Sequence, residues 1–265
     1  MRTVEGPGWK MIHGDCLDVL AAMPDKSVAV TLTDPPYEVE AHTLQRRYKT
    51  GPALSSDGER RVTNAPLNFA AIDSVDRVNV AALIARLTEH RALAFCQAEA
   101  IKDWKEAFNA AGMPYRRAIP WTKPAAMPSL HGRYPGQAFE AIALAQFPSA
   151  PACPMGGAAR HYSFTRARPG QAGGPGGTEA FHPTTKPLPL MLAMVTDFTE
   201  PGDIVLDPFA GSGTTGVACI RLGRQFIGIE KDPAYFEIAC RRLAGDEAKP
   251  RKEQPSLFDL LGATP

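Results

Sequence analysis

Continuous apolar runs alternate along the chain with segments in which apolar residues recur at helical spacing. The run 28–33, VAVTLT, is unbroken and rich in β-branched residues, which is typical of a strand buried on both faces of a parallel sheet. The segment 98–112 is amphipathic and stops at Gly112, as helices commonly do. The same reasoning predicts strands at 10–15, 28–33, 91–97, 115–123, 139–147 and 225–232, helices at 16–24, 78–89, 98–112 and 233–243, and a strand, glycine loop and helix within 203–223.

Strands that alternate with helices predict an α/β fold with a doubly wound, mostly parallel sheet. We expect a single domain over 1–245. Within it, 38–68 is polar and turn-rich, which predicts a long mobile loop. Residues 148–181 are rich in Gly and Pro with interspersed Arg, which indicates an irregular excursion, and the charged segment 246–265 is expected to be a flexible tail.

Composition narrows the class of protein. The 265 residues are 44% hydrophobic and 22% charged, as in ordinary soluble globular proteins. Five cysteines without CxxC or Cys/His spacing favour reduced thiols in the cytoplasm and argue against a zinc site or a disulfide framework. We therefore expect no metal. No segment has the length of a membrane span or the apolar core of a signal peptide.

The net charge of +1 conceals a basic block. Residues 116–186 contain eight Lys and Arg but only two acids, so the rest of the chain is acidic. A local cationic surface favours an anionic partner, with nucleic acid as the obvious one, and a solvated basic loop as the alternative.

The strand at 28–33 runs directly into Asp34, Pro35, Pro36 and Tyr37. Two prolines remove two backbone donors and prevent the strand from continuing. The turn therefore offers one carboxylate, free carbonyls and an aromatic ring at the mouth of the sheet. An isolated Asp-Pro pair would more often be a plain surface turn, so the remaining motifs decide its meaning.

The segment LDPFAGSGTTG fits G-x-G-x-x-G at Gly211, Gly213 and Gly216, between a predicted strand and helix. Glu230 ends the next strand, where an acid can bind ribose hydroxyls. The pattern predicts a dinucleotide or another adenosine compound, with a tight structural turn as the alternative. Asp207 would repel a pyrophosphate and favours a cationic amino or sulfonium group instead.

Little chain follows this loop, too little to complete a dinucleotide domain in the usual order. We therefore expect the N-terminal strands to complete a circularly permuted fold, with 28–33 beside the glycine-loop strand. This arrangement would bring Asp34–Tyr37 next to the ligand at the carboxyl ends of the strands.

Three motifs in this order resemble the permuted β group of the DNA amino-methyltransferases that use S-adenosylmethionine. They are the DPPY turn at 34–37, HPTTKP at 182–187 and FAGSG at 209–213, and GDCLDVL and IPWTKP are similar to the family too. The resemblance covers about 10–245. It implies a class I methyltransferase fold of Rossmann-like type.

The resemblance also implies a mechanism. The Asp34 carboxylate and the Pro35 carbonyl would accept hydrogen bonds from the exocyclic amino group of a base flipped out of the duplex, and Tyr37 would stack on that base. We therefore predict Asp34, Pro35, Pro36 and Tyr37 as catalytic. An aspartate at this position goes mostly with adenine N6, which is the assignment we favour, and cytosine N4 is the alternative.

Cofactor roles follow from the same resemblance. Asp207 and the glycine loop would hold the methionine part, Glu230 the ribose, and Asp15 with Cys16 the adenine. Lys186 would lie near the methionine carboxylate, with a phosphate or solvent contact as the alternative. The predicted cofactor-binding residues are Asp15, Cys16, Thr185, Lys186, Asp207, Pro208, Phe209, Ala210, Gly211, Ser212, Gly213, Thr214, Thr215, Glu230 and Lys231.

Duplex DNA is the predicted partner. We expect the excursion at 148–181 to recognise the target, with His161, Tyr162 and Phe164 among its contacts, and the loop at 38–68 to close over the DNA. The predicted DNA-binding residues are Arg46, Arg47, Tyr48, Lys49, Arg160, Arg166 and Arg168. A restriction-modification role in a bacterial or phage-infected cytoplasm fits this interpretation, and a homodimer stays open.

The tail segment 254–261, QPSLFDLL, is an apolar island in a charged stretch. It is similar to peptides that dock on the bacterial DNA sliding clamp, with Gln254, Leu257 and Phe258 as anchors; a segment that folds back on its own domain is the alternative. Tethering to a clamp would raise the local concentration near DNA.

Rival functions explain less of the sequence. An NAD-dependent oxidoreductase accounts for the glycine loop and Glu230 but leaves DPPY and HPTTKP unexplained. A non-catalytic DNA-binding protein would not need the DPPY and FAGSG motifs together. A methyltransferase acting on RNA or on a protein glutamine keeps the chemistry, but the basic excursion disfavours protein.

Overall fold

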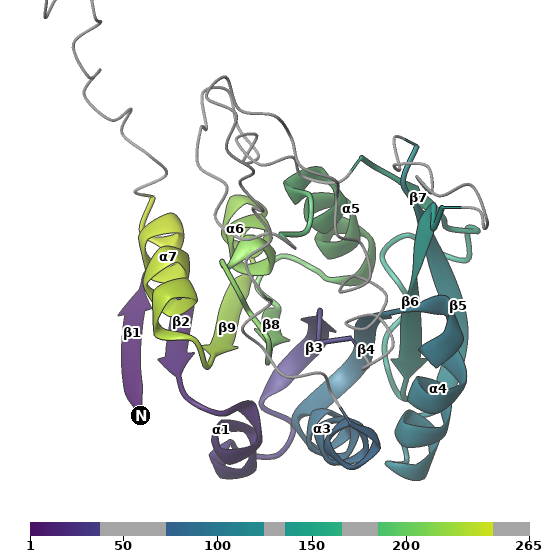
Figure 1. The fold of residues 1–265 in the computed structure, drawn as a ribbon, viewed down its shortest axis with the longest axis horizontal. Coiled ribbons are helices and arrows are strands. Elements are labelled where there is room, and N and C mark those ends of the chain that lie inside the picture. The colour runs from purple at the N-terminus through teal and green to yellow at the C-terminus, as the bar shows by residue number, and fades with distance from the viewer. Residues whose placement is uncertain (38–72, 125–135, 166–184, 246–265) are drawn as a thin grey trace, which may run out of the picture.

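The computed structural model describes residues 1–37, 73–124, 136–165 and 185–245. Its centre is a nine-stranded sheet with the order β1-β2-β9-β8-β3-β4-β6-β5-β7 (Figure 1). The strands are β1 (Arg2–Gly6), β2 (Trp9–His13), β3 (Val28–Thr33), β4 (Thr88–Cys96), β5 (Tyr115–Thr122), β6 (Phe139–Gln146), β7 (Tyr162–Ser163), β8 (Ile204–Asp207) and β9 (Gln225–Glu230).

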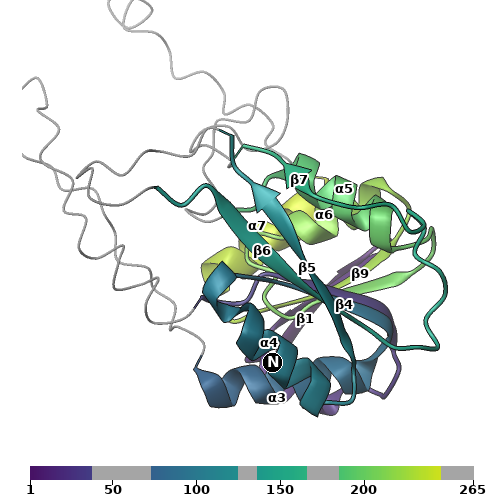
Figure 2. The ribbon, with the colours of Figure 1, turned by 90° about the vertical axis from the view of Figure 1, so that its right-hand side faces the viewer.

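Helices cover both faces of the sheet and make a three-layer α/β/α molecule (Figures 1 and 2). One layer holds the helices α1 (Cys16–Ala22), α3 (Ser74–Leu87) and α4 (Ile101–Ala110), with the short 3₁₀ helix η1 (Ala98–Ala100) before α4. The other layer holds α5 (Leu188–Phe198), α6 (Thr214–Arg221) and α7 (Pro233–Leu243). This architecture confirms the predicted α/β fold.

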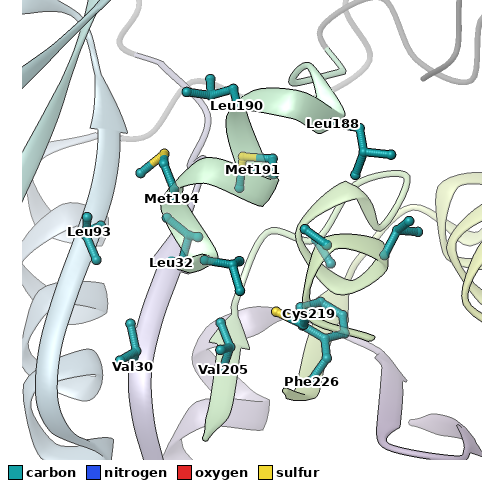
Figure 3. Close-up of a cluster of buried hydrophobic side chains, with 14 of the residues drawn as sticks. Val30, Leu32, Leu93, Leu188, Leu190, Met191, Met194, Val205, Cys219 and Phe226 are labelled. Atoms are coloured by element: carbon teal, nitrogen blue, oxygen red, sulfur yellow. The ribbon is translucent and has the colours of Figure 1, made fainter. Parts of the chain in front are cut away.

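The hydrophobic core lies on both sides of the sheet. On one side, Val30, Leu32 and Leu93 from the strands meet Met191 and Met194 of α5 (Figure 3). On the other side, α3 and α4 pack on β4 and β6 through residues such as Ile84, Trp104 and Phe108. Because β3 and the second half of β4 are covered on both faces, they read as nearly continuous apolar runs in the sequence.

Strand direction brings the charged residues of the motifs to one edge. In the described part, five of the eight strand pairings are parallel, including β2 with β9, β9 with β8, β8 with β3, and β3 with β4. The antiparallel β6 begins at this same edge, because Ala141 pairs with Cys96 at the end of β4. Asp34, Asp207 and Glu230 end or follow parallel strands, and Glu140 starts the antiparallel one.

Most predicted elements are present with small shifts at their ends, and β3 has the predicted bounds. The expected neighbour relation also holds, since Val30 and Thr31 of β3 pair with Val205 and Leu206 of β8. The sequence interpretation missed β1, β7 and α5. Helix α5 is apolar on most sides and begins among prolines, so it lacks the amphipathic period that identifies a surface helix.

Two kinds of feature are absent from the residues that the structure describes. No helix there is long and apolar enough to cross a bilayer. No group of three or more His, Cys, Asp or Glu side chains is placed there to hold a metal ion.

Candidate active site

Asp34 directly follows β3, and its carboxylate has one hydrogen-bonded and one unpaired oxygen. Its Oδ2 accepts a hydrogen bond of 2.6 Å from the Lys186 ammonium. Its Oδ1 is buried and has no hydrogen-bond partner among the residues that the structure describes. Since a buried, unpaired carboxylate oxygen is costly, this atom is the natural acceptor for a donor supplied by a ligand.

Lys186 connects the turn at 34–37 with the other half of the sheet. Its ammonium also donates to the Tyr37 hydroxyl at 3.3 Å and lies 3.3 Å from Glu140 Oε2. The rings of Tyr37, Phe95 and Trp121 surround it, with their centroids 4.9–5.8 Å away. Only 11% of the side chain is exposed, so a plain solvent contact is ruled out. The predicted contact with a methionine carboxylate stays a prediction.

Glu140 is the second carboxylate of this cluster. Its Oε1 pairs with the buried Lys123, and its Oε2 accepts a 2.7 Å hydrogen bond from the Tyr37 hydroxyl. Burial alone would raise the pKa of Glu140, but the two neighbouring lysines, Lys186 and Lys123, lower that pKa to about 2. Glu140 is therefore ionised across the whole physiological range.

The same cluster perturbs the pKa values of Asp34 and Lys186. Burial raises the pKa of Asp34 above its ordinary value, and the Lys186 charge opposes that rise. Burial would lower the pKa of Lys186, but Asp34 and Glu140 together raise it. Two carboxylates and two ammonium groups thus balance in a largely buried site.

Sequence reasoning did not identify Glu140, Lys123, Phe95 or Trp121 as parts of the site. Glu140 had a usable signal, because it is an acid in an otherwise apolar strand, FEAIALAQ. Lys123 and Trp121 lie in IPWTKP, which resembles the family but suggested no role for either residue. Their convergence depends on the antiparallel register, in which Trp121 pairs with Glu140.

Asp207 joins the turn after β3 to the glycine loop. Its Oδ1 accepts from the Thr33 hydroxyl at 2.8 Å and from the Phe209 amide at 3.1 Å, and its Oδ2 accepts from the Thr215 hydroxyl at 2.7 Å. Burial raises the pKa of Asp207 to about 6. Because Thr33 directly precedes Asp34, these contacts hold the glycine loop beside the turn at 34–37, which we call the acceptor turn.

The glycines of the loop have different surroundings. A Cβ on Gly216 would lie 2.5 Å from the Phe226 ring, so this glycine permits α6 to pack on β9. Gly211 has a φ of +52°, and apart from the two adjacent residues no described residue has an atom within 4 Å of the position that a Cβ would occupy there. A ligand can therefore approach the backbone of Gly211 closely, as an adenosine compound would require.

Other predicted cofactor residues are engaged within the chain. Arg242 donates to the Ser212 carbonyl and hydroxyl and to the Thr214 hydroxyl, which fixes the loop from behind. The two oxygens of Glu230 accept from the amides of Gly211 and Asp232 at 2.8 and 2.7 Å. Glu230 is therefore held against the backbone of the glycine loop by one oxygen and against the start of α7 by the other.

The residues predicted around an adenine also converge. Asp15 caps α1 by accepting from the Leu17 amide, and its other oxygen pairs with Lys231 at 2.9 Å. The hydrogen bond from Lys231 lowers the pKa of Asp15. Cys16 and Phe209 pack on the same apolar cluster, and burial raises the pKa of the Cys16 thiol to about 12. A neutral thiol and a ring suit an apolar base-binding wall.

Most predicted DNA contacts lie outside the described residues, including Arg46, Arg47, Tyr48, Lys49, Arg166 and Arg168. Arg160 is described, and it pairs with Asp197 at 2.8 Å. The expectation for Tyr162 is wrong, because its ring is 4% exposed and its hydroxyl donates to Asp197. Phe164 is partly buried against the same core. Both rings lie in or next to the short strand β7, which binds them to the sheet.

The predicted clamp anchors Gln254, Leu257 and Phe258 and the residues His182–Thr184 also lie outside the described ranges. Thr185 is described and half-buried, directly before Lys186. The HPTTKP motif therefore reaches the site at least through its lysine.

Comparison with known proteins agrees with this geometry. A family model for N6 and N4 methyltransferases, described as DNA methylase, matches residues 28–241. The putative methylase YubD of Escherichia coli K12 is 28% identical over 235 residues, which are 89% of this chain and 90% of that protein. The type II methyltransferase M2.DpnII of Streptococcus pneumoniae is 51% identical over 65 residues, 24% of each chain.

Two solved structures show the same fold. The M1.HpyAVI complex with S-adenosylmethionine (SAM) superimposes with a TM-score of 0.62 at 25% identity, over 89% of this chain and 99% of that one. The cytosine-N4-specific PvuII DNA methyltransferase gives a TM-score of 0.65 at 18% identity, over 89% and 86% of the two chains. The described molecule thus has the Rossmann-like fold of class I methyltransferases.

Proposed function

The chain belongs to the DNA methylase family of N6 and N4 methyltransferases and uses S-adenosylmethionine, and we propose that it methylates the N6 amino group of a flipped adenine in duplex DNA. The observation that carries the proposal is the buried Oδ1 of Asp34, unpaired among the described residues, at the carboxyl edge of the sheet, beside the glycine loop. Cytosine N4 is the alternative acceptor.

Asp34 would activate the amino group by hydrogen bonding. The lone pair of an exocyclic amino nitrogen is delocalised into the ring, which makes the nitrogen a poor nucleophile. Because Lys186 occupies Oδ2, Asp34 offers one oxygen, which takes one amino hydrogen, and the Pro35 carbonyl is the acceptor for the other. Two acceptors in fixed positions favour a tetrahedral nitrogen with a localised lone pair.

S-adenosylmethionine supplies, when bound, a methyl group on a sulfonium. The amino nitrogen would form a bond to that methyl carbon while the carbon–sulfur bond breaks, and S-adenosylhomocysteine would leave as a neutral thioether. The proton that the amino group then loses would pass to the Asp34 carboxylate, which already accepts its hydrogen bond, and from there to solvent. The chain's part is to place the nitrogen in line, and such positioning accounts for much of the rate that enzymes achieve. No nucleophilic side chain is required for this step.

The residues around the glycine loop would hold the cofactor as the resemblance implies. Gly211 leaves room for it, Glu230, which is bonded to the Gly211 amide, would bind the ribose hydroxyls, and Cys16 and Phe209, which pack on one apolar cluster, would contact the adenine. Asp207 would support the cofactor indirectly, because its hydrogen bonds hold Phe209 and Thr215 of the loop in place.

A base that is flipped out of the duplex needs an aromatic surface on which to stack. Tyr37 has its hydroxyl tied to Glu140, so its ring orientation is fixed before a base arrives. A fixed ring reduces the entropy lost when the base stacks on it, and stacking offsets part of the few kcal/mol that unstacking costs. This fits a stacked base as the acceptor.

Three further assignments belong to the same proposal. The order of the motifs, with the DPPY turn before the glycine loop, supports a circularly permuted fold. The basic excursion supports duplex DNA recognised through Arg166, Arg168 and the loop at 38–68. The tail motif at Gln254, Leu257 and Phe258 supports docking on a sliding clamp in a bacterial cytoplasm, and restriction-modification is the biological setting that fits.

The test is transfer of labelled methyl from S-adenosylmethionine to unmethylated duplex DNA, followed by analysis of the product nucleosides. We expect N6-methyladenine, and we expect its loss in Asp34→Ala. The matched control is Asp25→Asn, since Asp25 is 72% exposed and precedes β3 at the opposite edge of the sheet. N4-methylcytosine would overturn the base assignment, and product from the Asp34→Ala variant would overturn the role of the turn.

A further inference from the structure

Glu140 has a position that packing alone does not explain. It is the second residue of β6, is 7% exposed, and is the only charged residue in a strand that is apolar apart from Gln146 at its end. A buried carboxylate is expensive unless it is fully paired. The fold nevertheless places it at the edge where the acceptor turn lies, and both of its oxygens have partners there.

Each oxygen of Glu140 has a separate task. Oε1 pairs with Lys123, which directly follows β5. Oε2 receives the Tyr37 hydroxyl at 2.7 Å and lies 3.3 Å from the Lys186 ammonium. Glu140 therefore contacts both residues that touch or flank Asp34, although it does not itself contact the carboxylate of Asp34 in the described structure.

The ammonium of Lys186 has three hydrogens, and three acceptors surround it. They are Asp34 Oδ2, the Tyr37 hydroxyl and Glu140 Oε2. With all three in place, Lys186 can bond Asp34 through Oδ2 only, and Oδ1 stays open. Without Glu140, the ammonium could move towards Oδ1, and the Tyr37 hydroxyl would turn to Asp34 as its remaining acceptor, so the ring would lose its fixed orientation.

We propose that Glu140 is a positioning residue of the methyl-transfer site, which acts through Lys186 and Tyr37 to keep one oxygen of Asp34 free for the amino group and the Tyr37 ring aligned for the base. The inference rests on the proposed function of Asp34 but holds for adenine and cytosine alike. Lys123 neutralises the charge of Glu140, as Lys186 neutralises that of Asp34.

The charge of Glu140 also sets the pH range of the reaction, through its effect on Lys186 and Asp34. The charged and titratable groups that face Lys186 are Asp34 and Tyr37 from the turn after β3 and Glu140 from β6, and Lys123 at the end of β5 lies behind Glu140. The Glu140 charge raises the pKa values of both Lys186 and Asp34. Removal of this charge therefore lowers both, so both limbs of the pH–rate profile move to lower pH.

The experiment compares wild type, Glu140→Gln and the double variant Lys123→Met/Glu140→Gln in single-turnover methylation of DNA at saturating S-adenosylmethionine. The double variant removes both charges of a buried pair, a change that proteins often tolerate without loss of stability. We expect both variants to bind S-adenosylmethionine as wild type does, to react roughly 10–100-fold more slowly, and to show both pH limbs shifted downward.

The alternative is that Glu140 only neutralises Lys123. In that case the double variant would regain the wild-type rate and pH profile, and the proposal would be overturned. A wild-type rate in Glu140→Gln would overturn it too. Retained S-adenosylmethionine binding reports that each variant is folded, and Asp34→Ala run in parallel separates the two ideas: if Asp34→Ala stays active, the proposed function itself is wrong.

Discussion

Lys186 is the cation on which the buried acceptor cluster depends, and Lys186→Met tests that dependence. The variant keeps an unbranched apolar chain but removes an ammonium that lies 2.6 Å from Asp34 Oδ2 and 3.3 Å from Glu140 Oε2. The Lys186 and Asp34 side chains are 11% and 25% exposed, so water replaces little of the lost interaction.

Removal of one partner from a buried ion pair costs about 3–5 kcal/mol. For a domain of this size, each kcal/mol lowers the melting temperature by about 2–4 °C. We therefore expect Lys186→Met to melt roughly 6–20 °C below wild type near neutral pH.

The loss should depend on pH in a defined direction. Burial already raises the pKa of Asp34, and the Lys186 charge opposes that rise, so the pKa rises further in the variant. A carboxyl group whose pKa is higher in the folded than in the unfolded state stabilises the fold at low pH, and this contribution is lost as the pH rises through the folded pKa. The deficit relative to wild type should therefore grow with pH.

Thermal unfolding followed by circular dichroism, from about pH 5 to about pH 8, measures this effect. Lys102→Met is the control, because the Lys102–Glu106 pair spans 3.8 Å with both side chains mostly exposed and should contribute close to nothing. Asp34→Asn/Lys186→Met should recover part of the stability by removing the uncompensated carboxylate. A small deficit that does not change with pH, as in the Lys102 control, would show that the cluster does not depend on Lys186.

Three further predictions concern the cofactor loop and the DNA surface. Gly216→Ala should lose about 1–2 kcal/mol of unfolding free energy, because its Cβ would overlap the Phe226 ring and helix propensity only partly compensates; urea unfolding measures this, and Gly157→Ala, with open space around it, should be unaffected. The affinity for S-adenosylmethionine should fall as the pH drops through about 6, because Asp207 then takes up a proton and can accept fewer hydrogen bonds from the loop. Calorimetric titration of Asp207→Asn should show weaker binding without this pH dependence. A wild-type affinity that does not change with pH would contradict the prediction. Arg166→Ala/Arg168→Ala should reduce the slope of log affinity for DNA against log salt by about 1–2, whereas Lys102→Ala should leave the slope unchanged.

The motifs that carry local chemistry could be predicted from the sequence. The run at 28–33 followed by two prolines specifies both the strand β3 and the turn that ends it, since proline blocks further strand pairing. The turn of the glycine loop is likewise local, because Gly211 adopts a positive φ, which glycine tolerates. Such features depend on neighbouring residues and so are visible in one stretch of chain.

The partners that join across the sheet could not be predicted in this way. Glu140 meets Lys186 and Tyr37 only because β6 runs antiparallel beside β4, a choice that no local pattern encodes. The same holds for Arg160, whose pairing with Asp197 of α5 depends on a helix that the periodicity did not predict. Tyr162 was misassigned because its strand β7 has only two residues, which is too short to be recognised from the sequence.

The open oxygen of Asp34 is the group to which we assign activation of the amino nitrogen, and the decisive measurement is the single-turnover rate of Asp34→Asn with saturating S-adenosylmethionine and duplex DNA. Asparagine keeps the shape of the side chain but loses the charge and can present an N–H in place of an acceptor. We predict a fall in rate of about 10²-fold or more with cofactor binding retained. A rate close to that of wild type, in a variant that still binds S-adenosylmethionine, would show that Asp34 does not activate the amino group.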